Sequence, residues 1–253
     1  MATKTKIRNA AAVAEERILE LTTQFSNSNH DYNDTTIMTN SQTVKVPHLG
    51  GTIAAYRWAK QFNSSKPTVV LINSFGTSVE LYRSQFANEQ LTDAVNLIAI
   101  EPLGHGQTRT KAQHYTYWDS AVMNLQALQA LGLKGRTFVL GTSQGGWIAT
   151  RMALIAPERI AGIILLGTSM DSESDRSRNL GCWNAQELLT PMIKSFTVKE
   201  PTPDWEVPEA LVAAQIESGF GKDCPEERRQ FWRYVESIVE TNSKADLVLE
   251  VRD

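Results

Sequence analysis

The sequence predicts an α/β protein built on a mostly parallel β-sheet with helices on both faces. The chain is long enough for one large domain, four short runs are apolar throughout, and a helical segment separates each run from the next. The runs are TVVLIN (68–73), VNLIAI (95–100), RTFVLG (136–141) and IAGIILLG (160–167). Such runs are typical of strands that are buried on both faces of a parallel sheet.

The composition and charge of the chain indicate which partners and cofactors are not expected. Of 253 residues, 42% are hydrophobic and 21% are charged, and the formal net charge is −3. There is no basic stripe, so we expect no nucleic-acid partner. The longest apolar runs are too short to cross a bilayer, so we expect no membrane span. The two cysteines form no CxxC motif, and we expect no metal and no cofactor.

The N-terminal part divides into two segments. Residues 1–35 hold an expected amphipathic helix over 10–25 and a polar linker, SNSNHDYND. The stretch SQTVKVPHLGGTIAAYRWA (41–59) then predicts a β-hairpin, because two β-prone runs flank Gly50-Gly51. We assign the core to residues 36–170.

Helical segments alternate with the four apolar runs. They are SVELYRSQFANEQL (78–91), TYWDSAVMNLQALQAL (116–131) and SQGGWIATRMALIAPERI (143–160). In the second, Thr116 and Asp119 have the spacing of a capping box. Alternation of this kind implies right-handed βαβ crossovers. Residues 171–253 lack a clear strand pair and are expected to be helical and loop-rich.

The motif Gly-Thr-Ser-Gln-Gly, at 141–145, follows the third apolar run directly. A serine between small residues at a strand-to-helix junction is the pattern of a nucleophile elbow, which lifts the hydroxyl above the sheet. Gly145 and Gly146 would let the elbow and its helix approach the sheet. The alternative interpretation of Ser143 is an idle serine in a glycine-rich turn.

On these motifs the chain resembles the α/β-hydrolase superfamily. LINSFGTS (71–78) is similar to the loop after the third strand of the 3-oxoadipate enol-lactonase branch, with Asn73-Ser74 where many hydrolases have His-Gly. IEPLGHGQT (100–108) resembles the family's D-x-x-GHG-x-S, with Glu101 in place of the aspartate. The resemblance implies an α/β-hydrolase sheet, with residues 171–253 as a helical cap.

The resemblance also implies roles for individual residues. Ser143 would be the nucleophile toward an ester, thioester or lactone carbonyl. The backbone N–H of Gln144 would supply one oxyanion donor, and the N–H of Phe75 the other. Gly76 would let the loop that holds Phe75 bend toward the serine.

The triad of this family places an acid and then a histidine after the serine. All four histidines precede Ser143: His30, His48, His105 and His114. His105 lies in the GHG turn, where the family's histidine has a structural role and forms hydrogen bonds within its loop, so we do not assign it as the base. Asp171 is the candidate acid, and its alternative role is a capping or loop carboxylate.

Three explanations of the missing histidine stay open. The one we favour is a C-terminally truncated hydrolase that lacks the last two strands of its sheet. The others are a degenerate hydrolase that binds a ligand or partner without hydrolysis, and an unorthodox base supplied by His105, by a second subunit or by the substrate. Loss of two strands would leave the outer edge of the sixth strand unpaired, so we expect self-association through that sheet edge.

The substrate expectation rests on the C-terminal segment. Trp183, Trp205 and Trp232 would line an apolar pocket or pack the cap helices together, and we expect a small apolar carbonyl substrate. GTSMDSESDRSRNLGCW (167–183) and GFGKDCPEE (219–227) resemble fungal α/β-hydrolases of secondary-metabolite and host-selective toxin clusters. An acyltransferase on the same scaffold is an alternative. We expect a cytoplasmic location, or a peroxisomal one by resemblance, although the terminal VRD is no peroxisomal signal.

Overall fold

Within the described residues, six strands form one sheet in the order β1-β2-β4-β3-β5-β6. The structure is a computed structural model that describes residues 41–112, 115–168 and 174–180 and a few single positions between 213 and 230. The strands are β1 (Gln42–Val46), β2 (Thr52–Trp58), β3 (Thr68–Ile72), β4 (Asn96–Ile100), β5 (Thr137–Thr142) and β6 (Ile160–Leu166). The last four coincide with the four apolar runs, so the strand predictions are confirmed.

The sheet is mixed, and its parallel part carries the loops of interest. β3, β4, β5 and β6 run parallel to one another, whereas β2 is antiparallel to both β1 and β4. The carboxyl ends of parallel strands meet at the same edge of a sheet. The loops after β3, β4 and β5 therefore gather there.

The predicted hairpin is confirmed. β1 and β2 pair with Val46 opposite Thr52, and the turn between them is the four-residue segment α2 (His48–Gly51), which is not a regular helix. Leu49 and Gly50 both have positive φ angles, of 51° and 74°. His48 Nε2 lies 2.9 Å from Asp119 Oδ1 of helix α5 (Tyr117–Ala130), so the turn is attached to that helix.

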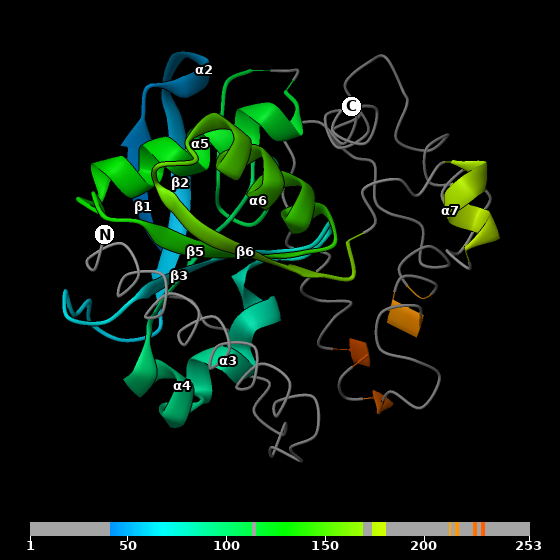
Figure 1. Cartoon of the computed structure of the whole chain (residues 1–253), viewed down its shortest axis with the longest axis horizontal. Coiled ribbons are helices and arrows are strands. Elements are labelled where there is room, and N and C mark those ends of the chain that lie inside the picture. Colours follow the sequence, from blue (N-terminus) through cyan, green and yellow to red (C-terminus); the bar gives the residue numbers. More distant parts are fainter. Residues whose placement is uncertain are drawn as a thin grey trace, which may run out of the picture.

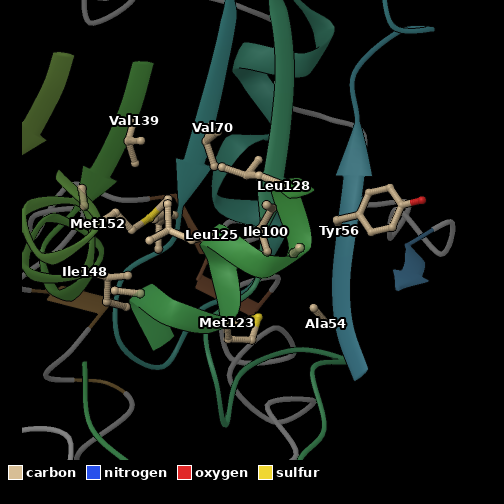
Figure 2. Close-up of a cluster of buried hydrophobic side chains, with 14 of the residues drawn as sticks. Ala54, Tyr56, Val70, Ile100, Met123, Leu125, Leu128, Val139, Ile148 and Met152 are labelled. Atoms are coloured by element: carbon tan, nitrogen blue, oxygen red, sulfur yellow. The ribbon is translucent and has the colours of Figure 1, made fainter. Parts of the chain in front are cut away.

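Alternate side chains of the central strands enter two separate cores. Residues such as Val70, Ile98 and Val139 belong to one apolar cluster, and their neighbours such as Val69 and Leu97 belong to the other. Figure 2 shows the first cluster, in which helix side chains gather beside those of the strands. Burial on both faces explains why the strands are apolar throughout instead of alternating.

Helices cover both faces of the sheet, as predicted (Figure 1). α5 (Tyr117–Ala130) and α6 (Gln144–Ile155) contribute to the first cluster. η1 (Val79–Tyr82), α3 (Arg83–Ala87) and α4 (Glu89–Ala94) lie on the other face. The predicted capping box of α5 is present, with reciprocal hydrogen bonds between Thr116 and Asp119.

One helical segment differs from the expectation. The stretch 78–91 was expected to be helical between two strands, and it forms three short pieces. Asn88 separates α3 from α4, because its backbone is extended and its side chain accepts a hydrogen bond from the Leu91 N–H. An asparagine that caps a new helix necessarily ends the preceding one.

Several predictions fall outside the described residues. These are the helix over 10–25, the linker, and almost all of the cap region. Of that region the structure describes the short helix α7 (Asp175–Asn179) and a few single positions. No helix in the described part of the chain is long and apolar enough to cross a membrane.

β6 forms one edge of the described sheet. Within the described residues its strand neighbour is β5 alone. Ile163, Leu165 and Leu166 on this strand are each 38–40% exposed.

Candidate active site

Ser143 sits at the sharp turn between β5 and α6. Its backbone has φ 52° and ψ −117°, a conformation that costs a non-glycine residue free energy. The residue is exposed, although the residues on either side of the turn are mostly buried. This is the geometry that the sequence motif predicts for an elbow, with the serine raised above the carboxyl edge of the sheet.

The two glycines of the motif and Gly146, which follows it, are required by close contacts. A Cβ on Gly141 would lie 2.2 Å from the Gly145 carbonyl, and one on Gly145 would lie 2.1 Å from the Ile72 carbonyl oxygen. A Cβ on Gly146 would lie 2.0 Å from Thr168 Oγ1. These contacts agree with the prediction that Gly145 and Gly146 allow the elbow and its helix to approach the sheet.

The end of β6 fixes the elbow from the other side. The Ser143 N–H donates to the Leu166 carbonyl at 2.8 Å, and the Ser143 carbonyl accepts from the Thr168 hydroxyl at 2.9 Å. The Gly146 N–H donates to the same carbonyl at 3.0 Å. The sequence does not indicate this role of Thr168, because nothing in the local sequence GTS (167–169) predicts a contact with residue 143.

The loop after β3 is folded by its own polar side chains. The buried Asn73 amide donates to the Thr77 carbonyl at 2.7 Å and to the Ser74 carbonyl at 3.2 Å. The Thr77 hydroxyl donates to the Ser74 carbonyl at 2.8 Å. Gly76 has φ 70°, a backbone conformation that favours glycine, and the predicted bend of this loop toward Ser143 stays a prediction.

Glu101 organises the loop after β4. Its carboxylate accepts from the Val79 N–H at 3.1 Å and from the Gln107 N–H at 2.7 Å. A Cβ on Gly106 would lie 2.1 Å from this carboxylate, which explains the second glycine of GHG. Burial raises the pKa of Glu101, because desolvation outweighs the two N–H donors.

His105 lies at the centre of these loops and is fully buried. Its Nδ1 is 2.9 Å from the Leu103 carbonyl oxygen, a hydrogen bond within its own loop as the GHG resemblance predicts. Its Nε2 is 2.9 Å from Gln144 Nε2 and 3.3 Å from the Gly76 nitrogen. The Phe75 ring packs edge-on against the imidazole, with 6.0 Å between ring centroids. Burial lowers the pKa of His105 to about 4.

The structure thus brings Phe75 and Gln144, the two proposed oxyanion residues, to one histidine. Gln144 is the first residue of α6, and the N–H groups of a first helical turn have no acceptor within the helix. The Gly76 N–H donates to His105 at 3.3 Å, and Phe75 stays the proposed oxyanion donor on that loop by resemblance. These assignments stay predictions.

The expected partners of Ser143 are not assembled by the described residues. No hydrogen bond joins the Ser143 hydroxyl to another described residue. His48 is paired with Asp119, and both ring nitrogens of His105 are engaged. The candidate acid Asp171, and also His30 and His114, lie outside the described residues. Among described positions, no three His, Cys, Asp or Glu side chains are grouped to hold a metal.

Tyr82 supports the elbow from the opposite face of the sheet. Its buried hydroxyl donates to the Ile72 carbonyl at 2.6 Å and lies 3.1 Å from Thr142 Oγ1. Ile72 is also the residue that excludes a side chain at Gly145. The sequence does not indicate this role of Tyr82, because VELY (79–82) predicts only a largely apolar helical segment.

These features define an α/β protein with a strained, exposed serine at a strand-to-helix turn. Residues 67–191 match the family described as alpha/beta hydrolase fold. The described part of the chain therefore has the α/β-hydrolase fold, as the sequence resemblance predicts.

Known relatives match parts of the chain. The 3-oxoadipate enol-lactonase 2 of Acinetobacter baylyi is 24% identical over 193 residues, which cover 72% of this chain and 64% of the relative. The acetyltransferase component of the acetoin cleaving system of Cupriavidus necator is 27% identical over 110 residues, 44% of this chain and 28% of the relative. The chain thus spans less than two thirds of each of these curated relatives.

Solved structures share the fold at low identity. An esterase from Exiguobacterium antarcticum has a TM-score of 0.63 and 20% identity, and the match covers 82% of this chain and 71% of the esterase. The enol-lactonase from Burkholderia xenovorans has a TM-score of 0.60 and 20% identity, with 81% and 71% covered. At this identity the likeness establishes the fold alone.

Proposed function

We propose that the protein is a serine hydrolase in which Ser143 attacks the carbonyl of an ester, thioester or lactone. The observation that carries the proposal is the strained, exposed serine between β5 and the N-terminus of α6. The esterase and the enol-lactonases among the similar proteins support this substrate class.

The chemistry follows from the position of the serine. Ser143 Oγ forms a bond to the acyl carbon, the bond from that carbon to the leaving oxygen or sulfur breaks, and the leaving group takes the hydroxyl proton. Water then releases the acid from the acyl-enzyme. The N–H groups of Gln144 and Phe75 are the proposed donors to the oxyanion. One such donor is worth a factor of about 10²–10³ in rate.

The proton of Ser143 needs an acceptor during the first step. Neither described histidine is arranged for it, since His105 is held by three neighbours and His48 by Asp119. Asp171, a few residues after β6, is the proposed acid that would orient a base. The same observation favours a second candidate function, a non-catalytic protein of this fold that binds a ligand or partner.

The substrate and the biological setting are narrower proposals. A small apolar carbonyl compound fits the aromatic residues of the 171–253 segment, and the resemblance of 167–183 and 219–227 supports a role in fungal secondary-metabolite or toxin biosynthesis. We propose a cytoplasmic protein, with a peroxisomal one as the alternative.

Turnover of simple substrates tests the proposal. Purified chain and Ser143→Ala are assayed with p-nitrophenyl acetate and with an aliphatic lactone, and circular dichroism establishes that both are folded. We expect hydrolysis that falls at least 100-fold in Ser143→Ala. Equal rates in the two proteins, or no turnover by a folded chain, would reject the hydrolase in favour of the binding protein. Ester formation when an alcohol is added would identify an acyltransferase.

A further inference from the structure

His105 connects the three loops at the carboxyl edge of the sheet. The Leu103 carbonyl can only accept a hydrogen bond, so the proton of the imidazole is on Nδ1. Nε2 therefore carries the lone pair and can only accept. Both groups that face it, the Gly76 N–H and the Gln144 side-chain amide, are donors.

The two donors to Nε2 belong to the two segments that would form the oxyanion hole. Gly76 directly follows Phe75, and Gln144 itself carries the other proposed N–H. A single acceptor atom that binds both segments fixes their separation. We propose that His105 is a positioning residue that sets the spacing between the Phe75 and Gln144 N–H donors. The inference rests on the proposed function of Ser143 and adds a residue that acts without touching substrate.

The orientation of Gln144 supports this role. Its side chain is 4% exposed, and its Oε1 is buried without a hydrogen-bond partner among the described residues. An unmatched buried carbonyl oxygen costs free energy. The reversed amide would place Oε1 against the Nε2 lone pair, so the NH₂ group is the end of the amide that faces His105. The bond to Leu103 would suffice to fold the GHG turn, whereas the Nε2 contacts reach the other two loops.

Two substitutions distinguish the role of Nδ1 from the role of Nε2. His105→Asn keeps a donor near Nδ1 for the Leu103 carbonyl and removes the acceptor at Nε2. His105→Gln reaches the Nε2 position with an amide oxygen and so keeps the acceptor. A purely structural histidine predicts similar losses in both variants, and a positioning histidine predicts rescue by glutamine alone.

Each variant is examined with two readouts. The first is the hydrogen-exchange rate of the Gly76 amide by NMR, which needs no chemistry at Ser143. The second is the rate of phosphonylation of Ser143 by a fluorophosphonate, resolved into an initial binding constant and a maximal rate. Denaturant unfolding establishes that each variant is folded.

We expect His105→Asn to exchange the Gly76 amide at least 10-fold faster and to lower the maximal phosphonylation rate by about 10²–10³, the effect of one lost oxyanion donor. The initial binding constant should not change. His105→Gln should lie within about 10-fold of wild type in both readouts, on the same donor-loss scale.

Three results would overturn the inference: wild-type phosphonylation by folded His105→Asn, equal losses in the two variants, or unchanged Gly76 exchange. If His105→Asn does not fold, Gln144→Met tests the positioning role instead, because it removes the Gln144 contact to Nε2. Phosphonylation of Gln144→Met at the wild-type rate would reject that role. If wild type itself is not phosphonylated, the proposed function fails, and Gly76 exchange alone tests whether His105 fixes the loop.

Discussion

Substitution of Gly145 by alanine should damage both the stability and the geometry of the elbow. The new Cβ would lie 2.1 Å from the Ile72 carbonyl oxygen and 3.0 Å from that of Asn73, whereas ordinary contacts begin near 3.4 Å. Both obstacles are backbone atoms of β3 and the loop after it, so no side chain can rotate away. The start of α6 must therefore move by more than 1 Å.

We expect Gly145→Ala to lower the free energy of unfolding by about 1–3 kcal/mol, the usual cost of overpacking. Displacement of α6 also moves Ser143 and the Gln144 N–H. A misplacement of about 1 Å can cost about 100-fold in rate, so phosphonylation of Ser143 should slow by a similar factor.

The matched control is Gly135→Ala, because a Cβ at Gly135 meets nothing within 4 Å. Its unfolding free energy should stay within about 0.5 kcal/mol of wild type, as at most surface positions. Both variants are measured by equilibrium urea unfolding. If Gly145→Ala were as stable as Gly135→Ala, that result would contradict the close contact between α6 and β3.

Other consequences concern strain, protonation, capping and association. Ser143→Gly should raise the free energy of unfolding by about 1 kcal/mol in urea, because glycine relieves the positive φ; an unchanged midpoint would argue against a strained elbow. The pKa of His105 falls from 6.5 to about 4 on folding, so the unfolded chain takes up a proton at higher pH than the folded chain does. This residue alone should therefore lower the free energy of unfolding by about 3 kcal/mol between pH 7 and pH 4. In His105→Gln this part of the pH dependence should vanish, and an identical profile would contradict the buried neutral histidine. Thr116→Ala removes the capping box of α5 and should cost about 1 kcal/mol; a loss below 0.3 kcal/mol by urea unfolding would count against the cap. The β6 edge should drive self-association that Leu165→Lys weakens, and a concentration-independent monomer in sedimentation velocity would reject that expectation.

The sequence was sufficient to predict the strands and the elbow for a physical reason. Strands buried on both faces are apolar throughout, and the four such runs coincide with β3, β4, β5 and β6. The GTSQG motif can be recognised from five consecutive residues, although Gly145 is needed for a contact with Ile72 of the adjacent strand β3. Local patterns of this kind need no knowledge of distant partners.

Contacts between loops were beyond the reach of sequence reasoning. His105 was expected to hydrogen-bond within its own turn, and its contacts with Gly76 and Gln144 join positions 29 and 39 residues apart. Thr168 and Tyr82 act on the elbow in the same way, through partners that only the folded sheet brings near. The break at Asn88 was missed because one capping side chain outweighed the helical pattern around it.

The central claim is that the elbow presents Ser143 as a reactive nucleophile. The most direct measurement is fluorophosphonate labelling of the folded chain, read by intact mass with Ser143→Ala as the control. We predict a single adduct on the wild-type chain that is absent from Ser143→Ala. A folded wild-type chain that gains no mass, or an adduct that persists in Ser143→Ala, would contradict the claim.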